Sequence, residues 1–349
     1  MESQIRLSGA ALELPGGVTV RFMRTLRLPE QGTHPLPPGL GTFPLRRVAD
    51  YPGRAPARWL ERGGVLLPVY QREAMWLGFS SPVPAALQVG VGKVCAVSGR
   101  PWTSRLSRDP QNYVVLPRQP WLDGINSGAG TIRQFVAVPL GLGATVEGQV
   151  SGAEVWGGVQ LQVFELREEA LERWRETRKP QVRARGAWSG AGGGLPPGAA
   201  PFPPNSLGAV APSVAPRAMP AQAAPAMGLG AGGRMRQEVF RDERPATDWR
   251  EEPSGRVYVH LATAPQWRAV TGEAAPPSPV DRAAYNAAGL PWFDYYDADG
   301  DDLAAAGPLS GVKPVGDWLG DDEEGWVPPK PEQIKPLGDD PGLVADGEW

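Results

Sequence analysis

The sequence has very few residues of the kinds that build metal centres and disulfide frameworks, with one cysteine and two histidines in 349 residues. One cysteine excludes an intramolecular disulfide, and two distant histidines beside it do not make a zinc site. Cys95 lies in the apolar run VGKVCAVSG, which predicts a small buried side chain instead of a reactive thiol. His34 lies in a proline-rich loop predicted over 31–44, and His260 falls on the polar face of a predicted strand, so both are interpreted as surface histidines.

Long hydrophobic segments are also missing. No run reaches the ~18 apolar residues of a membrane-spanning helix, so no span is expected. The N-terminal residues MESQIRLSGA lack a basic region followed by an apolar run, and a signal peptide is therefore not expected. The cytoplasm is the predicted location, and the bias toward Ala, Gly, Pro and Arg is typical of a GC-rich bacterial genome.

The chain also has no large excess of positive or negative charge. Charged residues make up 21% of the chain and the net charge is −3, which favours neither nucleic acid nor a membrane surface as a partner. The basic run 173–185 could contact phosphates, but glutamates interrupt it and nucleic acid is not expected. The chain has no Gly-x-Ser-x-Gly motif, and its glycine-rich segments GINSGAG and GLGAGG lack the lysine of a phosphate-binding loop. No catalytic motif is therefore identified.

Alternating patterns are present, and the chain is organised around residues 120–165. Residues 132–138 are apolar on both faces, which predicts a central strand. In 159–163, Val and Leu alternate with Gln, which predicts a half-buried strand. Glycines recur between these segments and indicate turns, with a short strand predicted at 145–150. The predicted product is an antiparallel meander.

Alternation extends to the N-terminal part of the chain. Residues 18–28 form an amphipathic pattern and follow Pro-Gly-Gly, so they predict a hairpin with a short strand at 10–14. Further strands are predicted at 65–70, 74–79 and 87–97. The predicted fold class is mainly β: an antiparallel sandwich or open barrel, with a long disordered linker and a smaller mixed α+β C-terminal part.

Composition divides the chain into five parts: a β-rich domain 1–165, a short charged helix and tail 166–188, a Gly/Ala/Pro-rich linker 189–226, a second β-containing segment 227–310, and an acidic tail 311–349 with prolines and tryptophans. In the linker Arg217 is the only charged residue, which is typical of a flexible segment. GAGTIRQFV and GAGGRMRQEV lie on either side of the linker. The second segment could repeat the first, form a domain of its own, or add strands to the N-terminal sheet.

Two polar groups are candidates for binding. Arg72 and Glu73 separate two apolar runs, and are interpreted either as a polar turn at the rim of the sheet or as a cluster facing a cleft. Arg133 and Gln134 follow a glycine turn and start the central strand. They join the first pair as candidate binding residues.

A third candidate is the acidic and aromatic segment GLPWFDYYDADGDDL at 289–303. Its Asp297, Asp299 and Asp301 have the spacing that opens a calcium-binding loop, but the glycine and glutamate expected later in that loop are missing. The same aspartates could belong to an Asp-x-Asp site for a divalent ion, or to a solvated acidic turn. Aromatic side chains of this kind are enriched at interfaces, and the candidate contact residues are Trp292, Tyr295 and Tyr296. Docking of these side chains on the protein's own β core explains them equally well and is the favoured interpretation.

Three motifs resemble a family of uncharacterised bacterial proteins: VYQREAMW, PWLDGI…IRQFVAVPLG and GLPWFDYYD. The resemblance covers most of both ordered parts and leaves out the linker. It implies that the central and acidic-aromatic segments occur together, and it carries no activity, ligand or catalytic residue.

The favoured hypothesis is a non-enzymatic β-rich binding or structural protein that acts through a protein partner or as a homo-oligomer, with no cofactor. The alternative is a metal-assisted hydrolase or transferase that uses the acidic cluster 294–302 with a divalent cation. A component of a secretion or phage-like assembly is the third hypothesis.

Overall fold

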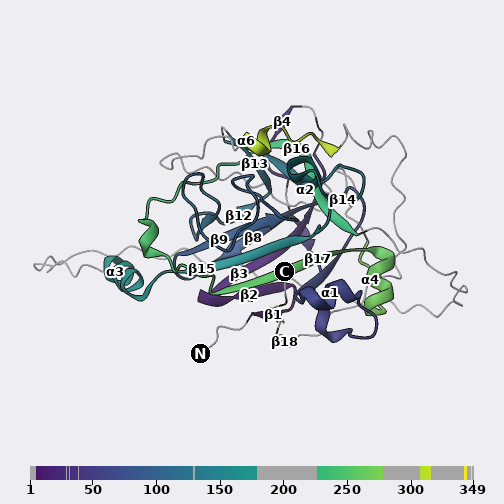
Figure 1. Ribbon diagram of the computed structural model, residues 1–349, viewed down its shortest axis with the longest axis horizontal. Coiled ribbons are helices and arrows are strands. Elements are labelled where there is room, and N and C mark those ends of the chain that lie inside the picture. The colour runs from purple at the N-terminus through teal and green to yellow at the C-terminus, as the bar shows by residue number, and fades with distance from the viewer. Residues whose placement is uncertain are drawn as a thin grey trace, which may run out of the picture.

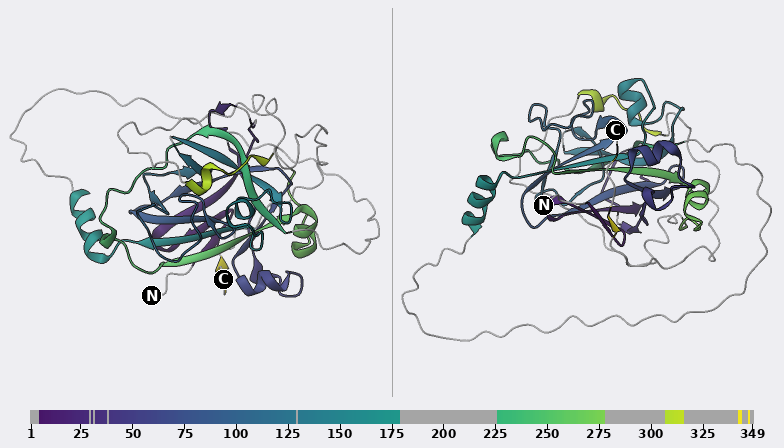
Figure 2. Two further views of the ribbon diagram at one scale, coloured as in Figure 1. Left: turned by 45° about the horizontal axis from the view of Figure 1, so that its top comes forward. Right: turned by 60° about the horizontal axis from the view of Figure 1, so that its bottom comes forward.

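The computed structural model describes residues 5–28, 30, 32–37, 39–128, 130–178, 226–277, 307–315, 342–343 and 347. The strands in these ranges form two sheets that lie in separate layers (Figures 1 and 2). The predicted mainly β sandwich is confirmed, and the sheets do not close into a barrel. No helix in these ranges combines the length and apolar character that crossing a membrane requires.

The larger sheet, sheet A, has 11 strands within the described residues, in the order β18-β1-β2-β3-β8-β14-β16-β4. Three more strands pair beside this path: β5 with β3, β12 with β8 and β13 with β14. The bounds are β1 Arg6–Ser8, β2 Ala11–Leu14, β3 Val18–Thr25, β4 Thr33–His34, β5 Gly39–Thr42, β8 Ala74–Ser80, β12 Trp121–Leu122, β13 Gly124–Gly128, β14 Thr131–Pro139, β16 Met227–Arg236 and β18 Gly342–Leu343.

The smaller sheet, sheet B, has 7 strands within the described residues, in the order β10-β9-β15-β17-β7-β6, and β11 pairs with β9. Pairing is antiparallel throughout the two sheets except for β16 with β4 and β17 with β7. The bounds are β6 Arg46–Arg47, β7 Val65–Val69, β9 Ala85–Val91, β10 Val94–Cys95, β11 Val114–Leu116, β15 Val159–Glu165 and β17 Gly255–Thr263.

One apolar core joins the two layers. Phe22 and Leu77 of sheet A belong to the same buried cluster as Leu161 and Val259 of sheet B. Burial of apolar area contributes about 25 cal/mol per Å², so this shared core is the main reason why the sheets pack face to face. Cys95 also lies in the cluster, which confirms that it is a small buried residue.

Helices lie on the outside of the sandwich and at its ends (Figure 1). Trp59 and Trp267 bring two of them, α1 and α4, into one cluster with Leu66 of β7 and Ala262 of β17. Trp174 of α3 packs beside Phe164 of β15. The helices are η1 Pro15–Gly17, η2 Val48–Asp50, α1 Ala57–Arg62, α2 Val146–Ser151, α3 Glu168–Arg178, η3 Ala246–Asp248, α4 Ala264–Thr271 and α6 Gly307–Ser310.

The N-terminal hairpin forms as predicted. β2 pairs antiparallel with β3 through the turn at Pro15–Gly17. Gly16 and Gly17 both have positive φ, a conformation that glycine adopts without steric cost. Val20 and Phe22 point into the core while Arg21 is exposed, as a period of two requires.

The central stretch differs from the predicted meander because its two main strands belong to different sheets. β14 is a central strand of sheet A, as predicted, whereas β15 lies in sheet B between β9 and β17. The strand predicted at 145–150 is wrong: this segment is helix α2, which begins because the Thr145 hydroxyl accepts a hydrogen bond from the Gly148 amide.

The predicted half-buried strand is also wrong, because both faces of β15 are covered. Gln160 and Gln162 are buried, and the Gln160 amide donates to the Gly92 carbonyl oxygen at 2.6 Å. β9 and β17 pair with β15 on its two sides, and the side chains that the alternation places toward solvent are buried.

Two further sequence predictions are corrected. The loop predicted over 31–44 contains the short strands β4 and β5, which pair with β16 and β3. His260 is not a surface residue: its ring stacks on Trp59 at a centroid distance of 4.9 Å and lies 4.6 Å from the Tyr258 ring. Burial lowers the pKa of His260 to about 3, so the ring is neutral at physiological pH.

The segment after the linker completes both sheets. β16 pairs with β14 of sheet A, and β17 pairs with β15 and β7 of sheet B. The glycine-rich run GLGAGG at 228–233 is part of β16, where it lies against neighbouring chain. A Cβ at Gly232 would lie 2.6 Å from a methyl carbon of Val136. Of the arrangements considered for the second segment, the one in which it adds strands to the N-terminal sheet is observed.

Candidate functional site

The first pair of predicted site residues, Arg72 and Glu73, forms a junction between strands of sheet A. Glu73 is buried and not at the rim, and its carboxylate accepts a hydrogen bond from Arg24 Nε of β3 at 2.7 Å. The other carboxylate oxygen accepts from the Tyr70 amide at 3.0 Å. Arg72 has a φ of 65° and its amide donates to the Ala137 carbonyl of β14 at 2.6 Å. These groups hold β3, β8 and β14 together.

The second pair lies in the same sheet. Gln134 is fully buried and its side chain bridges the backbone of the segment after β3: Nε2 donates to Leu26 O at 2.7 Å and Oε1 accepts from Leu28 N at 2.9 Å. Arg133 is 9% exposed and lies opposite Arg234 of β16. The structure thus brings Glu73 and Gln134 to the same end of β3, in a structural network.

The third candidate group lies outside the described residues. This applies to Trp292, Tyr295 and Tyr296 and to the predicted metal ligands Asp297, Asp299 and Asp301, so the contact residues and the metal site both stay predictions. Within the described ranges, no three His, Cys, Asp or Glu residues are grouped so that they could hold a metal ion.

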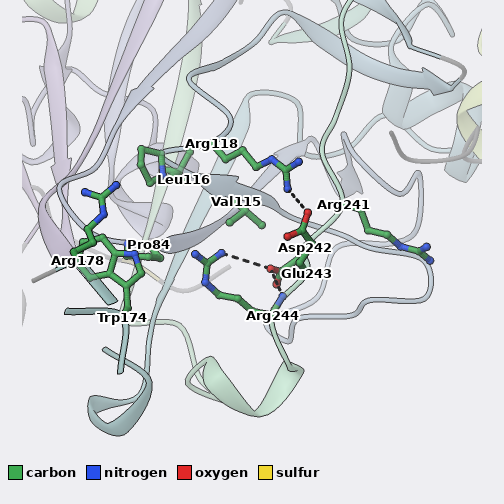
Figure 3. Close-up of a pocket in the computed structure, with 11 residues that line it drawn as sticks. Pro84, Val115, Leu116, Arg118, Trp174, Arg178, Arg241, Asp242, Glu243 and Arg244 are labelled. Carbon is green, nitrogen blue, oxygen red and sulfur yellow. Dashed lines mark hydrogen bonds and ion pairs between the residues drawn. The ribbon is translucent and has the colours of Figure 1, made fainter. Parts of the chain in front are cut away.

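A pocket of about 360 Å³ lies where helix α3, strand β11 and the segment between β16 and β17 meet (Figure 3). Trp174 and Arg178 come from α3 and lie at one end, and Arg241 lies at the other. The complete lining is Pro84, Val115, Leu116, Pro117, Arg118, Trp174, Arg178, Arg241, Asp242, Glu243 and Arg244.

The pocket carries an excess of positive charge, because four arginines line it together with only two acidic residues. Glu243 pairs with Arg118 at 2.9 Å. Asp242 Oδ1 lies 3.8 Å from the Arg244 guanidinium. In the described part of the chain, Arg178 and Arg241 have no carboxylate partner. Two guanidinium groups are therefore available to a ligand.

Aromatic rings hold several of these arginines in place. The guanidinium carbon of Arg178 lies 4.8 Å from the ring centroid of Trp174, and that of Arg118 lies 4.9 Å from the ring centroid of Phe240. Cation–π contacts of this kind contribute about 0.5–1 kcal/mol at exposed sites. They restrict the side chains, so that less conformational entropy is lost when a ligand binds.

Asp242 forms the rigid wall of the pocket. It is 1% exposed, and its Oδ2 accepts hydrogen bonds from Tyr113 Oη at 2.7 Å and Trp249 Nε1 at 2.8 Å. Burial raises the pKa of Tyr113, and the hydrogen bond to Asp242 acts in the same direction, so the phenol stays protonated as a donor. Gln111 Oε1 accepts from the Asp242 amide at 2.8 Å. These bonds fix the chain that carries Arg241 and Arg244.

The lining determines what this pocket can do chemically. Guanidinium groups are planar, permanently charged donors that match carboxylate and phosphate oxygens. None of the 11 residues that line the pocket is a serine, cysteine or histidine, so this lining offers groups for binding an anion and none of the usual side-chain nucleophiles.

Sequence reasoning missed most of this pocket. Arg178 falls in the basic run 173–185, for which no nucleic-acid binding is expected, whereas Arg241, Asp242 and Arg244 belong to none of the motifs identified in the sequence. The available signal was the run RDERPATDWREE at 241–252, in which arginines and one tryptophan are interleaved with acids between two strand patterns.

Comparison with known proteins adds no assignment, since no family model, no curated protein and no solved structure matches the chain. The resemblance to an uncharacterised bacterial family stays a prediction. The residues of the pocket are therefore the basis for a functional proposal.

Proposed function

We propose that this chain is a non-catalytic binding protein of the bacterial cytoplasm, and that its arginine-lined pocket recognises an anionic group of a partner protein. The observation that carries the proposal is the presence of two guanidinium groups, Arg178 and Arg241, without a carboxylate partner in the described residues of a preformed pocket. Arginine and tryptophan are both enriched where proteins bind each other.

The architecture supports binding rather than catalysis. The sandwich is the scaffold of the pocket, and Arg241 and Arg244 lie in the segment that joins two of its strands, which is where binding residues are common. The buried histidine is neutral and packed between aromatic rings, so it is not placed to act as a general base.

The proposal is tested by titrating the protein with a short oligoglutamate of about four residues, ~13 Å long when extended. Tryptophan carrying fluorine gives a ¹⁹F NMR signal for Trp174, assigned by its loss in Trp174→Phe. This signal should shift on titration. The variant Arg178→Gln/Arg241→Gln removes both cations. The peptide concentration at which the Trp174 shift is half complete should rise by about tenfold or more, because hydrogen bonds to charged groups contribute about 1.5–3 kcal/mol each.

The matched control is Arg21→Gln, which removes an exposed arginine of β3. Its titration should coincide with that of the wild type. Binding should also weaken with added salt, since exposed charges are screened. An unchanged titration of Trp174 in the double variant would show that the two arginines do not bind anions, and the proposal would be abandoned.

A further inference from the structure

A second cavity of about 400 Å³ lies on the other side of the Asp242 wall. Tyr113 and Trp249 line this second cavity, and both donate hydrogen bonds to Asp242 of the first. Arg108 lines it as well and donates to the backbone carbonyl oxygen of Asp242. The two cavities are therefore neighbours whose positions are fixed by one buried hydrogen-bond network.

The second cavity has the same charge pattern as the first. Arg105, Arg108, Arg167 and Arg250 line it, together with Glu251 and Glu252 as its acidic residues. Arg167 pairs with Glu251 at 2.7 Å. Within the described residues, neither Arg105 nor Arg250 has a carboxylate partner. Each cavity thus presents two unpaired guanidinium groups at its lining.

From this arrangement we infer that the two cavities together bind one extended acidic segment of a partner protein, with carboxylates in both. The inference rests on the proposed function and names its ligand class. An acidic segment that crosses the wall reaches both cavities at once, and the second contact then forms at high effective concentration.

The mixed charge of both linings favours an acidic protein segment over nucleic acid. A nucleic-acid groove needs continuous positive charge along a regular phosphate backbone. Here Glu243, Glu251 and Glu252 interrupt it. Arginine and tryptophan, which both line these cavities, are enriched at protein interfaces.

The chain next to the first cavity cannot supply the acidic ligand. Residues 179–225, which follow the last residue of α3, contain no aspartate or glutamate, and their first residues add Lys179, Arg183 and Arg185. The sequence 179–225 that follows α3 therefore holds no carboxylate that could serve as this ligand, which is consistent with a separate protein as the source of the acidic segment.

Isothermal titration calorimetry of the full chain tests the inference with two oligoglutamates, one of about four residues (~13 Å) and one of about twelve (~40 Å). The short peptide should bind with a stoichiometry of two per chain and the long one with a stoichiometry of one. The long peptide should bind at least tenfold more tightly. The variant Arg105→Gln/Arg250→Gln removes the unpaired cations of the second cavity. Its affinity for the long peptide should fall to that for the short peptide.

Failure of the inference is distinguishable from failure of the proposed function. If the long peptide binds no more tightly than the short one, or if Arg105→Gln/Arg250→Gln changes nothing, the two-cavity inference is overturned. The Trp174 titration still decides the proposed function in that case. Arg21→Gln should behave as the wild type in both titrations.

Two competitors complete the experiment. A single-stranded oligonucleotide should bind more weakly than the long peptide, and tighter binding would overturn the choice of ligand. The chain's own acidic run at 321–324 is neutralised in Asp321→Asn/Asp322→Asn/Glu323→Gln/Glu324→Gln. Peptide affinity should not change in this variant, and a tenfold gain would show that the occupant is the chain's own segment.

Discussion

Among substitutions in sheet A that keep the side-chain volume, the replacement of Glu73 by glutamine should be one of the most destabilising. The side chains of Arg24 and Glu73 are 8% and 2% exposed, so the ion pair between them is almost completely removed from water. Glutamine keeps the volume and can still accept a hydrogen bond from the Tyr70 amide, but it leaves the Arg24 charge buried without a counter-charge. Removing one partner of a buried pair costs about 3–5 kcal/mol.

The free energy of unfolding of Glu73→Gln is obtained from urea titrations followed by circular dichroism. We expect a lower midpoint with an unchanged dependence on urea, because the surface exposed on unfolding stays the same. The matched control is Arg24→Met/Glu73→Gln, which removes both charges and should be more stable than Glu73→Gln alone. A loss below ~1 kcal/mol, the range of exposed ion pairs, would refute the claim that this pair joins β3 to β8.

Three further predictions concern single buried or capping groups. Burial raises the pKa of the Asp123 carboxyl well above its usual range, so ionised Asp123 opposes folding. The variant Asp123→Asn should therefore be more stable than the wild type at high pH. This gain in stability should vanish below about pH 4, where the carboxyl is protonated in both the folded and the unfolded state. Burial raises the pKa of Glu154, but hydrogen bonds from Thr145 and its neighbours outweigh it and lower the pKa overall. Glu154→Gln should therefore be less stable than the wild type at neutral pH, and the difference should shrink as pH falls below about 4. Thr263→Ala removes a capping box with Gln266 and should cost about 1 kcal/mol of unfolding free energy in a thermal or urea titration; equal stability of the two proteins would rule out the cap.

Local patterns were sufficient to predict the hairpin and the mainly β fold. The alternation from Val18 onward, preceded by Pro-Gly-Gly, specifies both the turn and the buried face of β3. Strands β7 and β8 and helix α3 also fall where the sequence places them. In each case the residue pattern that specifies the element lies within a few residues along the chain.

Long-range contacts explain what the sequence did not predict. The alternating pattern predicts that Gln160 is exposed, but the loop carrying Gly92 and the neighbouring strands bury it. The same kind of pattern places His260 on the polar face of its strand, but the ring of Trp59 from α1 stacks on it. At Thr145 the error was local, because the threonine was assigned to a strand although its hydroxyl caps helix α2.

The candidate site was hidden for a related reason. Arg178 and Arg241 are separated by the linker and by β16, and the pocket exists only because β16 and β17 return to the two sheets. The predicted pairs around Glu73 and Gln134 were polar residues in apolar surroundings, which is the signature of a structural network as well as of a site.

Hydrogen–deuterium exchange with and without the long oligoglutamate tests the central claim most directly. Amides in 105–118, 167–178 and 241–252, the segments that line the two cavities, should exchange more slowly with peptide bound. Strands β1 to β3 of sheet A should be unaffected. Protection confined to other segments, or none at saturating peptide, would contradict the assignment of this surface as the binding site.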